Sequence, residues 1–399
     1  MVRLVHTADW QIGKGYGNVA EEAACRLRQA RIGAVDRVGV AAREFDAAYV
    51  VVAGDLWDSP TLPMETVHEC FHAIGRVRRP VLVIPGNHDH GGSDGIWHRP
   101  EVQESQQRHA PNLRLLAQPE PVLLPDLVVL PCPLLRRHSA TDSTAWLRSF
   151  PWDTLPTDRP RLVLAHGSVT NFSGRVQHNV IDPDQLPTAA LDYIALGDWH
   201  GLKQVGPKAW YCGTPEPDCF DKDGSGRRSQ VLLVEVERGQ TPRVTPHSTG
   251  HFHWHHLETE LSGAEDLHHL QQQVDGYIGN RVRRDLLSMD LGHSILDFAS
   301  HERYVEWSRR LREQLLVVVH KGSCTAVPAG DDLNALLNRP EDPLVCSVAN
   351  QLQRRRLEGP DSEIASKALA ELFRMVRRKD TTPQPVTVDK DATGPLSDL

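Results

Sequence analysis

The first ninety residues alternate between short apolar runs and longer amphipathic stretches. The apolar runs 2–8, 47–53 and 81–84 have the length and composition of strands that are buried on both faces of a sheet. The stretch 20–44 carries apolar residues at helical spacing, and a second helix is expected over about 62–78. This order predicts a β-α-β-α-β unit with parallel strands and right-handed crossover connections.

Beyond residue 91 the apolar runs become shorter and turns become more frequent. We expect a loop and a short helix over 95–110, a short helix over 142–149, and the end of the first domain in the turn-rich stretch 238–250. Further strands are expected at 113–116, 121–124, 127–131, 161–165, 192–196, 202–206, 209–212 and 230–236. The first three of these strands are assigned to a second sheet, so the domain should contain two mostly β layers flanked by helices.

The remaining part of the chain favours a small α+β unit that is followed by helices. Strands are expected at 251–260, 285–292 and 314–319, with helices at 263–275 and 301–313. The predicted domains are 1–248, a capping domain 249–325, a helical partner-docking region 326–378 and a disordered tail 379–399.

Two patterns in this part of the chain can each be interpreted in two ways. An apolar stripe at helical spacing is formed by Ile364, Leu369, Leu372, Phe373 and Val376. Core packing is the default interpretation of this stripe, and a docking helix for a partner is the alternative. Alternate positions at His251, His253 and His255 would place three imidazoles on one strand face, which is either a metal site or, by default, a solvated face.

Composition excludes some classes of protein. A length of 399 residues predicts two or three structural units. The net charge of -8 argues against a protein that coats nucleic acid by bulk charge, although a local basic groove or a metal site remains open. The seven cysteines are scattered, which favours reduced thiols. With no signal pattern and no apolar run long enough to cross a bilayer, we expect a cytoplasmic protein without membrane contact.

Polar residues gather at the ends of the expected strands. Five strands end in candidate metal ligands, namely Asp9 and Gln11, Asp55, Asn87 and His88, His166, and Asp198 and His200. Each motif alone is weak because Asp and His are common in turns, but five in one chain are hard to explain by turns. The carboxyl ends of parallel strands meet at one crevice. Carboxylate, imidazole and amide oxygen together suit Mn, Fe, Zn or Mg, and they suffice for two ions with one bridging carboxylate.

A two-metal site would suit hydrolysis at phosphorus. Two ions clamp the attacking and leaving oxygens and lower the pKa of a bound water, so that a metal-bound hydroxide can act as the nucleophile near neutral pH. A nearby imidazole can donate a proton to the leaving oxygen, which contributes roughly a hundred- to ten-thousandfold in rate. His88 is the best candidate for this donor, since its neighbour Asn87 would be held on the metal.

These motifs resemble those of the calcineurin-like metallophosphoesterases. The resemblance rests on Asp9-x-Gln11, Gly54-Asp55, Gly86-Asn87-His88-Asp89, Ala165-His166-Gly167 and Gly197-Asp198-Trp199-His200. The segments 6–10, 51–58, 192–197 and 211–215 are similar to those of the SbcD-type DNA repair exonucleases, and the similarity covers about residues 1–240. It implies an α/β fold, a four-layer αββα sandwich with a small α+β capping domain and a C-terminal helical segment.

The resemblance also implies roles for individual residues. One metal would be held by Asp9, Gln11 and His200, the other by Asn87, His166 and Asp198, with Asp55 bridging and His88 catalytic. The expected cofactors are two divalent ions, Mn²⁺ in the first place and Mg²⁺ or Fe²⁺ as alternatives. The expected partners are DNA and an SMC-like coiled-coil ATPase of the SbcC type bound through C-terminal helices, and the nucleases of this type form homodimers.

Two positions depart from the family pattern, which usually has histidine where this chain has Gln11 and Asp198. An amide oxygen is a poorer ligand than an imidazole, so we expect a weaker first metal position. The added carboxylate makes the second position richer in oxygen, and both changes favour Mn²⁺ or Mg²⁺ over Zn²⁺. The alternative interpretation is a decayed site that binds one metal or none.

The leading hypothesis is a DNA exonuclease or endonuclease that hydrolyses phosphodiesters in double-strand break repair. A phosphoesterase for nucleotides or phosphoproteins is the second hypothesis, and a non-catalytic scaffold for an ATPase is the third. Asp58 and Asp89 are expected to orient the site histidines. Basic residues near the site are Lys14, Arg136 and Arg137, but none is assigned to DNA. Tryptophans next to ligands, at Trp10, Trp57 and Trp199, could stack on a base, but packing is the preferred interpretation.

Overall fold

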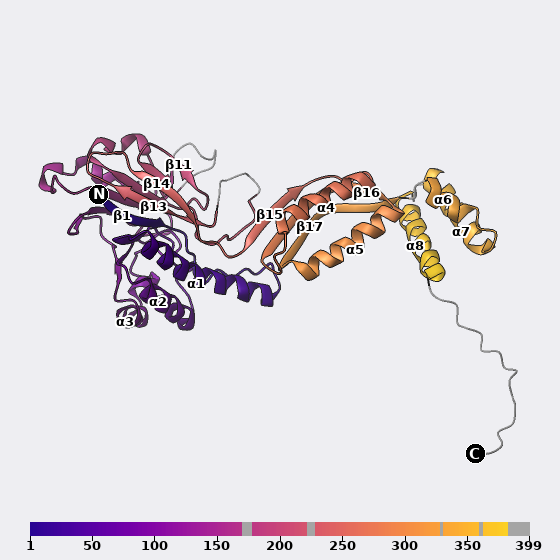
Figure 1. Ribbon diagram of the computed structural model, residues 1–399, viewed down its shortest axis with the longest axis horizontal. Coiled ribbons are helices and arrows are strands. Elements are labelled where there is room, and N and C mark those ends of the chain that lie inside the picture. The colour runs from indigo at the N-terminus through magenta and orange to yellow at the C-terminus, as the bar shows by residue number, and fades with distance from the viewer. Residues whose placement is uncertain (170–177, 222–227, 328–329, 359–361, 382–399) are drawn as a thin grey trace, which may run out of the picture. The chain divides into compact units, whose positions relative to one another are not determined.

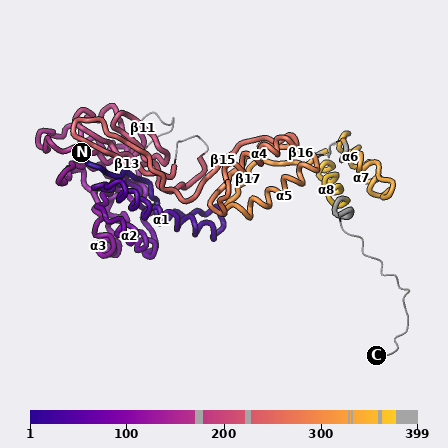
Figure 2. Tube along the Cα trace, viewed as in Figure 1, coloured from indigo at the N-terminus to yellow at the C-terminus, as the bar shows by residue number. Residues whose placement is uncertain are grey.

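The computed structural model describes residues 1–169, 178–221, 228–327, 330–358 and 362–381. The chain divides into two compact units (Figures 1 and 2). The first contains 1–256, 281–287 and 315–317, and the second contains 257–280, 288–314 and 318–399. The expected boundary between a capping domain and a helical region, at 325–326, stays a prediction.

The first sheet of the first unit contains the three parallel strands that the pattern predicts within residues 1–90. Its order is β14-β13-β1-β2-β3-β4, in which β1 (Val2–Thr7), β2 (Tyr49–Val52), β3 (Val81–Val83) and β4 (Leu113–Leu115) are parallel, whereas β13 (Gln230–Val236) and β14 (Arg243–Ser248) are antiparallel additions. The helices α1 (Glu21–Glu44), α2 (Met64–Val77) and α3 (Pro100–His109) gather on one side of it (Figure 1).

Two expectations about this sheet were wrong. The strand at 113–116 was assigned to the second sheet, but β4 pairs in parallel with β3 in the first. The stretch 238–250 was expected to be turns, but it holds β14, which contains Pro246. Proline lacks the backbone N–H that a central strand needs, and β14 lies at the sheet edge, where proline is tolerated.

The second sheet has the order β11-β12-β10-β7-β6-β5. These strands are β11 (Lys203–Gln204), β12 (Ala209–Tyr211), β10 (Tyr193–Gly197), β7 (Arg161–His166), β6 (Val128–Cys132) and β5 (Val122–Leu123), and the four in the middle are parallel. A small parallel pair joins β8 (Ser168–Val169) to β9 (Val180–Ile181). The expected helix at 142–149 is the 3-10 helix η2 (Ala145–Ser149).

The two sheets pack face to face and give the α/β fold its layers. Alternation along the strands sends Val5 and Val50 toward the helices, while Leu4 and Val51 face the second sheet. The outer face of the second sheet is covered by loops and the short 3-10 helices η2, η3 (Trp152–Thr154), η4 (Pro183–Gln185) and η5 (Thr188–Ala190). The fourth layer of the sandwich is therefore thin.

The second unit is smaller and combines strands with helices. A three-stranded sheet, most of whose residues belong to this unit, joins β15 (His253–Glu258), β16 (Asp285–Asp297) and β17 (Val317–Val327), accompanied by α4 (Ala264–Ile278) and α5 (Phe298–Gln314). The helices α6 (Gly330–Leu337), α7 (Pro343–Glu358) and α8 (Ser362–Thr381) follow. No helix in the part of the chain that the structure describes is long and apolar enough to cross a membrane.

The apolar stripe of α8 serves core packing. Leu369, Phe373 and Val376 are buried in a cluster that also contains Phe298 of α5, whereas Ile364 is 68% exposed and lies outside this core. The tail was expected to be disordered from residue 379, but α8 continues to Thr381. The rest of that stretch, 382–399, lies outside the described residues.

Candidate metal centre

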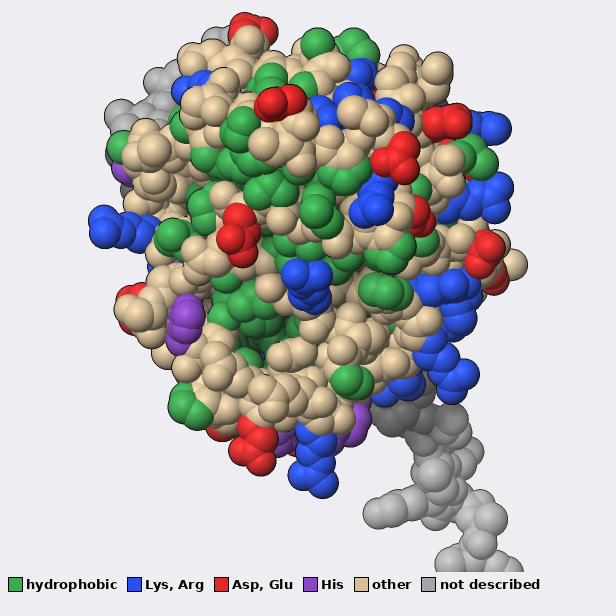
Figure 3. Space-filling view, turned by 90° about the vertical axis from the view of Figure 1, so that its left-hand side faces the viewer, with side chains coloured by type: hydrophobic (Ala, Val, Ile, Leu, Met, Phe, Trp, Pro, Cys, Tyr) green, Lys and Arg blue, Asp and Glu red, His purple; other side chains and the backbone are tan. Residues whose placement is uncertain are grey.

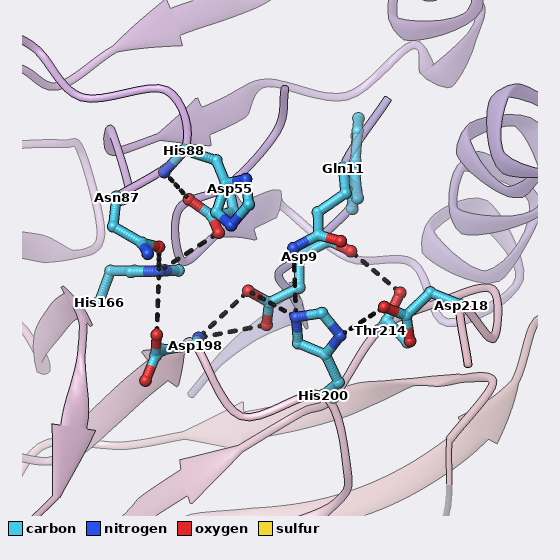
Figure 4. Close-up of polar contacts among 12 residues, drawn as sticks. Asp9, Gln11, Asp55, Asn87, His88, His166, Asp198, His200, Thr214 and Asp218 are labelled. Atoms are coloured by element: carbon cyan, nitrogen blue, oxygen red, sulfur yellow. Dashed lines mark hydrogen bonds and ion pairs between the residues drawn. The ribbon is translucent and has the colours of Figure 1, made fainter. Parts of the chain in front are cut away.

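The loops that follow β1, β2, β3, β7 and β10 converge at one end of the two sheets (Figure 4). Backbone hydrogen bonds tie them together, because the Asp9 N–H donates to the Gly54 carbonyl over 3.1 Å and the Gln11 N–H donates to the Asp55 carbonyl over 2.9 Å. The Asp198 N–H donates to both carboxylate oxygens of Asp9 over 3.2 Å, which joins the first sheet to the second. All seven expected ligands are thus brought into one cluster.

The backbone at the centre is strained, because several of the expected ligands have left-handed φ angles. Asp9, Gln11, Asp55 and Asp198 all have positive φ, at 53°, 41°, 54° and 100°. Such conformations cost about 1–3 kcal/mol each and persist where surrounding contacts enforce them, as at functional sites. Gly86 permits a close approach of two loops, since a Cβ there would lie 2.1 Å from Asp55 Oδ1.

The half of the centre around His166 has the donor set of a metal site. The His166 Nδ1–H donates to the Ala53 carbonyl over 2.8 Å, which directs Nε2 into the centre. That nitrogen lies 3.0 Å from Asn87 Oδ1, 3.6 Å from Asp55 Oδ2 and 3.8 Å from Asp198 Oδ1. Asp9, Asp55 and His166 each offer a ligand atom within 4.8 Å of the others.

Asp55 and Asp198 direct carboxylate oxygens at the same ring nitrogen, and a cation or a proton between them balances their charge. The Asn87 amide is satisfied when its N–H donates to His166 and Asp55, and in the opposite orientation it offers its oxygen to a cation. Burial alone lowers the pKa of His166, yet the charges of Asp55, Asp9 and Asp198 raise it to about 9. The negative field that holds this proton is the field that a divalent ion would neutralise, so the residues of this half fit a metal.

The burial of Asp9 supports the same conclusion. Its carboxylate is completely buried, and desolvation raises its pKa to about 6 against the opposing effect of His200 and His166. A buried carboxylate is unfavourable unless it is paired or binds a metal.

The half around His200 is arranged differently. His200 Nδ1 lies 2.8 Å from Asp218 Oδ2, and Nε2 lies 3.3 Å from Gln11 Nε2 and 4.0 Å from Asp9 Oδ1. The Lys14 ammonium donates to Gln11 Oε1 over 3.0 Å and to Asp218 Oδ2 over 2.9 Å. In this arrangement both polar ends of Gln11 and both nitrogens of His200 have partners within the protein.

Asp218 and Arg31 were missed by the sequence analysis. Asp218 is buried and also accepts from Arg228, and although burial raises its pKa, His200, Arg31 and Lys14 hold that pKa well below its usual range. Arg31 of α1 is 2% exposed and donates to the backbone carbonyls of Asp9 and Trp10 over 3.0 and 2.8 Å. Neither lies at a strand end, so no spacing signal marks them.

His88 lies at the rim of the cluster. Its N–H donates to Asp55 Oδ1 over 2.9 Å, and its Nδ1 lies 2.8 Å from the Asp58 carbonyl, which leaves Nε2 as the ring atom for proton transfer. Its side chain is 30% exposed, whereas that of His166 is fully buried. His88 is therefore the most exposed of the three site histidines, ahead of His200 at 20%.

The two carboxylates expected to orient histidines do so only in part. Asp58 holds His88 through its backbone carbonyl, and its carboxylate is 4.0 Å from the ring. The influence of Asp89 on His166 is electrostatic, and its hydrogen bonds go to backbone groups instead. Its carboxylate accepts from the N–H groups of Gly86, Leu56 and Trp57 over 2.7, 3.0 and 3.3 Å, which joins the loops after β2 and β3.

The tryptophans and basic residues that were considered for contact with DNA differ in how deeply they are buried. Trp10 and Trp57 are buried in the core beneath the helices, so packing is their role. Trp199 is partly buried, with the Lys203 ammonium 5.2 Å from its ring centroid. Arg136 and Arg137 are exposed, whereas Lys14 belongs to the centre itself.

The three histidines near β15 do not form a metal site among the described residues, where Asp9, Asp55 and His166 make the one cluster of three metal-binding groups. His255 Nε2 lies 2.7 Å from Asp285 Oδ1, and the ring of His253 lies 6.5 Å from that of His255. The solvated-face interpretation therefore fits this strand better.

Comparison with known proteins agrees with this geometry. The family model for calcineurin-like phosphoesterases matches residues 2–202. The SbcD component of the nuclease SbcCD from Escherichia coli O157:H7 is 25% identical over 280 residues, which cover 61% of this chain and 67% of that protein. The protein of the same name from Bacillus subtilis (strain 168) is 31% identical over 275 residues, which cover 60% and 67% of the two chains.

Proposed function

Because the chain belongs to the calcineurin-like phosphoesterases, we propose that it is a metal-dependent nuclease that hydrolyses phosphodiester bonds in DNA during double-strand break repair. The observation that carries this proposal is the buried convergence of Asp9, Asp55 and His166. DNA is favoured over a nucleotide or a phosphoprotein because the similarity to two nuclease components extends over 275 and 280 residues, beyond the span of the family model.

The proposed centre has two metal positions. Asn87, His166 and Asp198 would hold one ion, Asp9, Gln11 and His200 would hold the other, and the carboxylate of Asp55 would serve both. When bound, such ions neutralise the non-bridging oxygens of a phosphate and lower the pKa of water. Oxygen ligands dominate this set, which favours Mn²⁺, with Mg²⁺ or Fe²⁺ as alternatives.

The side chains of the rim position the substrate. Asp198 and His88 are 28% and 30% exposed, whereas Asp9 and Asp55 are buried, so the phosphate approaches from the side of the first pair. The Asp58 carbonyl fixes the ring of His88 through Nδ1. His88 then delivers the proton on Nε2 to the leaving oxygen of the scissile bond.

The proposal includes a partner protein. Both relatives are named as one component of a nuclease called SbcCD. We expect the partner of this chain to be an SMC-like coiled-coil ATPase and the helices α6 to α8 to bind it. Binding of the purified ATPase to the full chain, and its loss when Ile364 and Met375 are changed to Asp, would test this part, since these two exposed side chains lie outside the core of α8.

The catalytic part is tested by hydrolysis of linear DNA with Mn²⁺. His88→Gln should lower the rate at least a hundredfold and leave metal content unchanged, because the imidazole acts on the substrate. His247→Gln on β14 is the control and should keep full activity. A simple phosphodiester, bis(nitrophenyl) phosphate, is assayed in parallel. Hydrolysis of this ester alone would indicate that DNA needs the partner, and hydrolysis of neither substrate would support the scaffold hypothesis.

A further inference from the structure

We propose that the two metal positions are unequal, because Lys14 and Gln11 close the His200 half with an internal cation, so that the protein binds one ion tightly and a second one weakly. This inference rests on the proposed metal centre but goes beyond it. It concerns the order in which the positions fill, and it is read from the contacts of Gln11, one of the two positions that depart from the family pattern.

The first step is a closed ring of four side chains. Lys14 Nζ contacts both Gln11 Oε1 and Asp218 Oδ2, at 3.0 and 2.9 Å. The same Asp218 oxygen lies 2.8 Å from His200 Nδ1, and His200 Nε2 lies 3.3 Å from Gln11 Nε2 (Figure 4). Each of the four residues is thus held by two others.

The second step concerns the atoms that would bind the ion. The Asp218 carboxylate can only accept, so the His200 Nδ1–H donates to it, and Nε2 accepts from the amide N–H of Gln11. The oxygen of Gln11 is turned away to Lys14. Two of the intended ligands of this position, the amide oxygen of Gln11 and the imidazole nitrogen of His200, are therefore already used.

The third step is the contrast with the other half. Around His166 the carboxylates of Asp55 and Asp198 lie 3.6 and 3.8 Å from Nε2, and the one amide beside them, that of Asn87, is free to turn its oxygen to an ion. Around His200 the ring of four side chains holds the Gln11 amide in place by a contact at each end. Lys14 also places a positive charge in this half. Its side chain is 27% exposed, and its ammonium is paired with the buried carboxylate of Asp218. An ion entering this half must displace hydrogen bonds and work against that charge.

The role of Gln11 explains why glutamine suits this position. A carboxamide accepts from a lysine at its oxygen and donates to a histidine at its nitrogen at the same time. A neutral imidazole offers one donor and one acceptor on a rigid ring and would direct one nitrogen at the metal instead. The departure from the family pattern is then a functional feature and not decay.

The test is a titration of the metal-free full chain with Mn²⁺, followed by calorimetry and by electron paramagnetic resonance, which distinguishes single ions from coupled pairs. The natural protein should bind one ion, and the second at least tenfold more weakly. Lys14→Met should tighten the second ion at least tenfold, and Gln11→His should do the same by an independent route. Lys14→Arg keeps the charge and should resemble the natural protein, as should Arg136→Met, which removes an exposed cation outside the ring.

The affinities of the first and second ions either support or overturn the inference. Two ions of equal affinity in the natural protein would overturn the inference, and so would unchanged binding of the second ion in both Lys14→Met and Gln11→His. No binding at all would instead overturn the proposed metal centre. Because binding and not activity is measured, the two failures are distinguishable.

Discussion

At the residue scale, His6 is a histidine that the fold keeps neutral. It is fully buried in β1, its Nε2 lies 3.2 Å from the Leu196 carbonyl, and its Nδ1 lies 2.9 Å from the Tyr193 hydroxyl. Desolvation by burial lowers its pKa from 6.5 to about 3, although the hydrogen bond to Leu196 opposes this shift. Between pH 3 and pH 6.5, His6 is therefore protonated in the unfolded chain and neutral in the folded chain.

The pH dependence of stability follows from that difference. The contribution of neutral His6 is fully present above pH 6.5 and is lost as the pH falls toward 3, at about 1.4 kcal/mol per pH unit. Urea unfolding of the natural protein and of His6→Gln between pH 7 and 5 measures this. The stability advantage of the natural protein should shrink toward acid, and His268→Gln on the exposed face of α4 should show no such trend. If the free energies of unfolding of His6→Gln and of the natural protein changed with pH in parallel, the buried neutral state of His6 would be contradicted.

The limits of sequence analysis are also clearest at the residue scale. Asp9, Asp55 and His166 follow apolar runs, and parallel strands bring such positions together whatever the loops do. Asp218 has no such marker, because its place beside His200 depends on how the chain folds after β12. The orientation of the Gln11 amide depends on Lys14 and Asp218 at once, and no spacing rule contains that information.

At the element scale, the turn after β3 packs so closely against the loop after β2 that position 86 has no room for a side chain. At Gly86 a Cβ would lie 2.1 Å from Asp55 Oδ1 and 2.5 Å from Asp55 N. Gly86→Ala should therefore displace Asp55, lower metal binding at least tenfold and destabilise the fold by roughly 1–3 kcal/mol. Gly17→Ala, where a Cβ would meet nothing within 4 Å, is the matched control and should change neither quantity. Normal metal content in Gly86→Ala would show that this approach is not required.

The strands and helices themselves followed the hydrophobic pattern well, and the exceptions have physical causes. The strand at 113–116 was correctly found but placed in the wrong sheet, since an apolar run does not specify its neighbour. β14 was overlooked because its proline and exposed residues resemble a turn, which is how an edge strand appears in sequence.

At the scale of the whole molecule, charge does not mark a nucleic-acid surface. The chain carries a net charge of -8, and Figure 3 shows acidic and basic side chains interspersed over one face of the first unit. Bulk attraction therefore contributes little to DNA binding. Under the proposed function, bound cations and the proposed partner would supply this attraction, so the metal content is decisive for that proposal.

Removal of metal should destabilise the first unit selectively. An ion that binds only the folded state adds about 2.7 kcal/mol at a concentration of 100 times Kd, and without it the buried carboxylates of Asp9 and Asp55 repel each other. For a unit of this size that corresponds to roughly 5–10 °C in Tm. The second unit contributes no residue to the centre, so its transition should not move. Scanning calorimetry of the Mn²⁺-loaded protein before and after EDTA measures both transitions.

The matched variant for this experiment is Asp55→Asn. It removes the bridging charge while keeping the size of the side chain and an oxygen that can accept from the His88 N–H. Its first transition should be insensitive to EDTA, because little metal remains to be removed. Asp58→Asn, whose carboxylate lies 4.0 Å from the nearest ring atom of His88, should behave like the natural protein. If both transitions fell together on EDTA treatment, the metal would stabilise the chain from outside this centre, and the assignment of Asp55 as its bridge would be wrong.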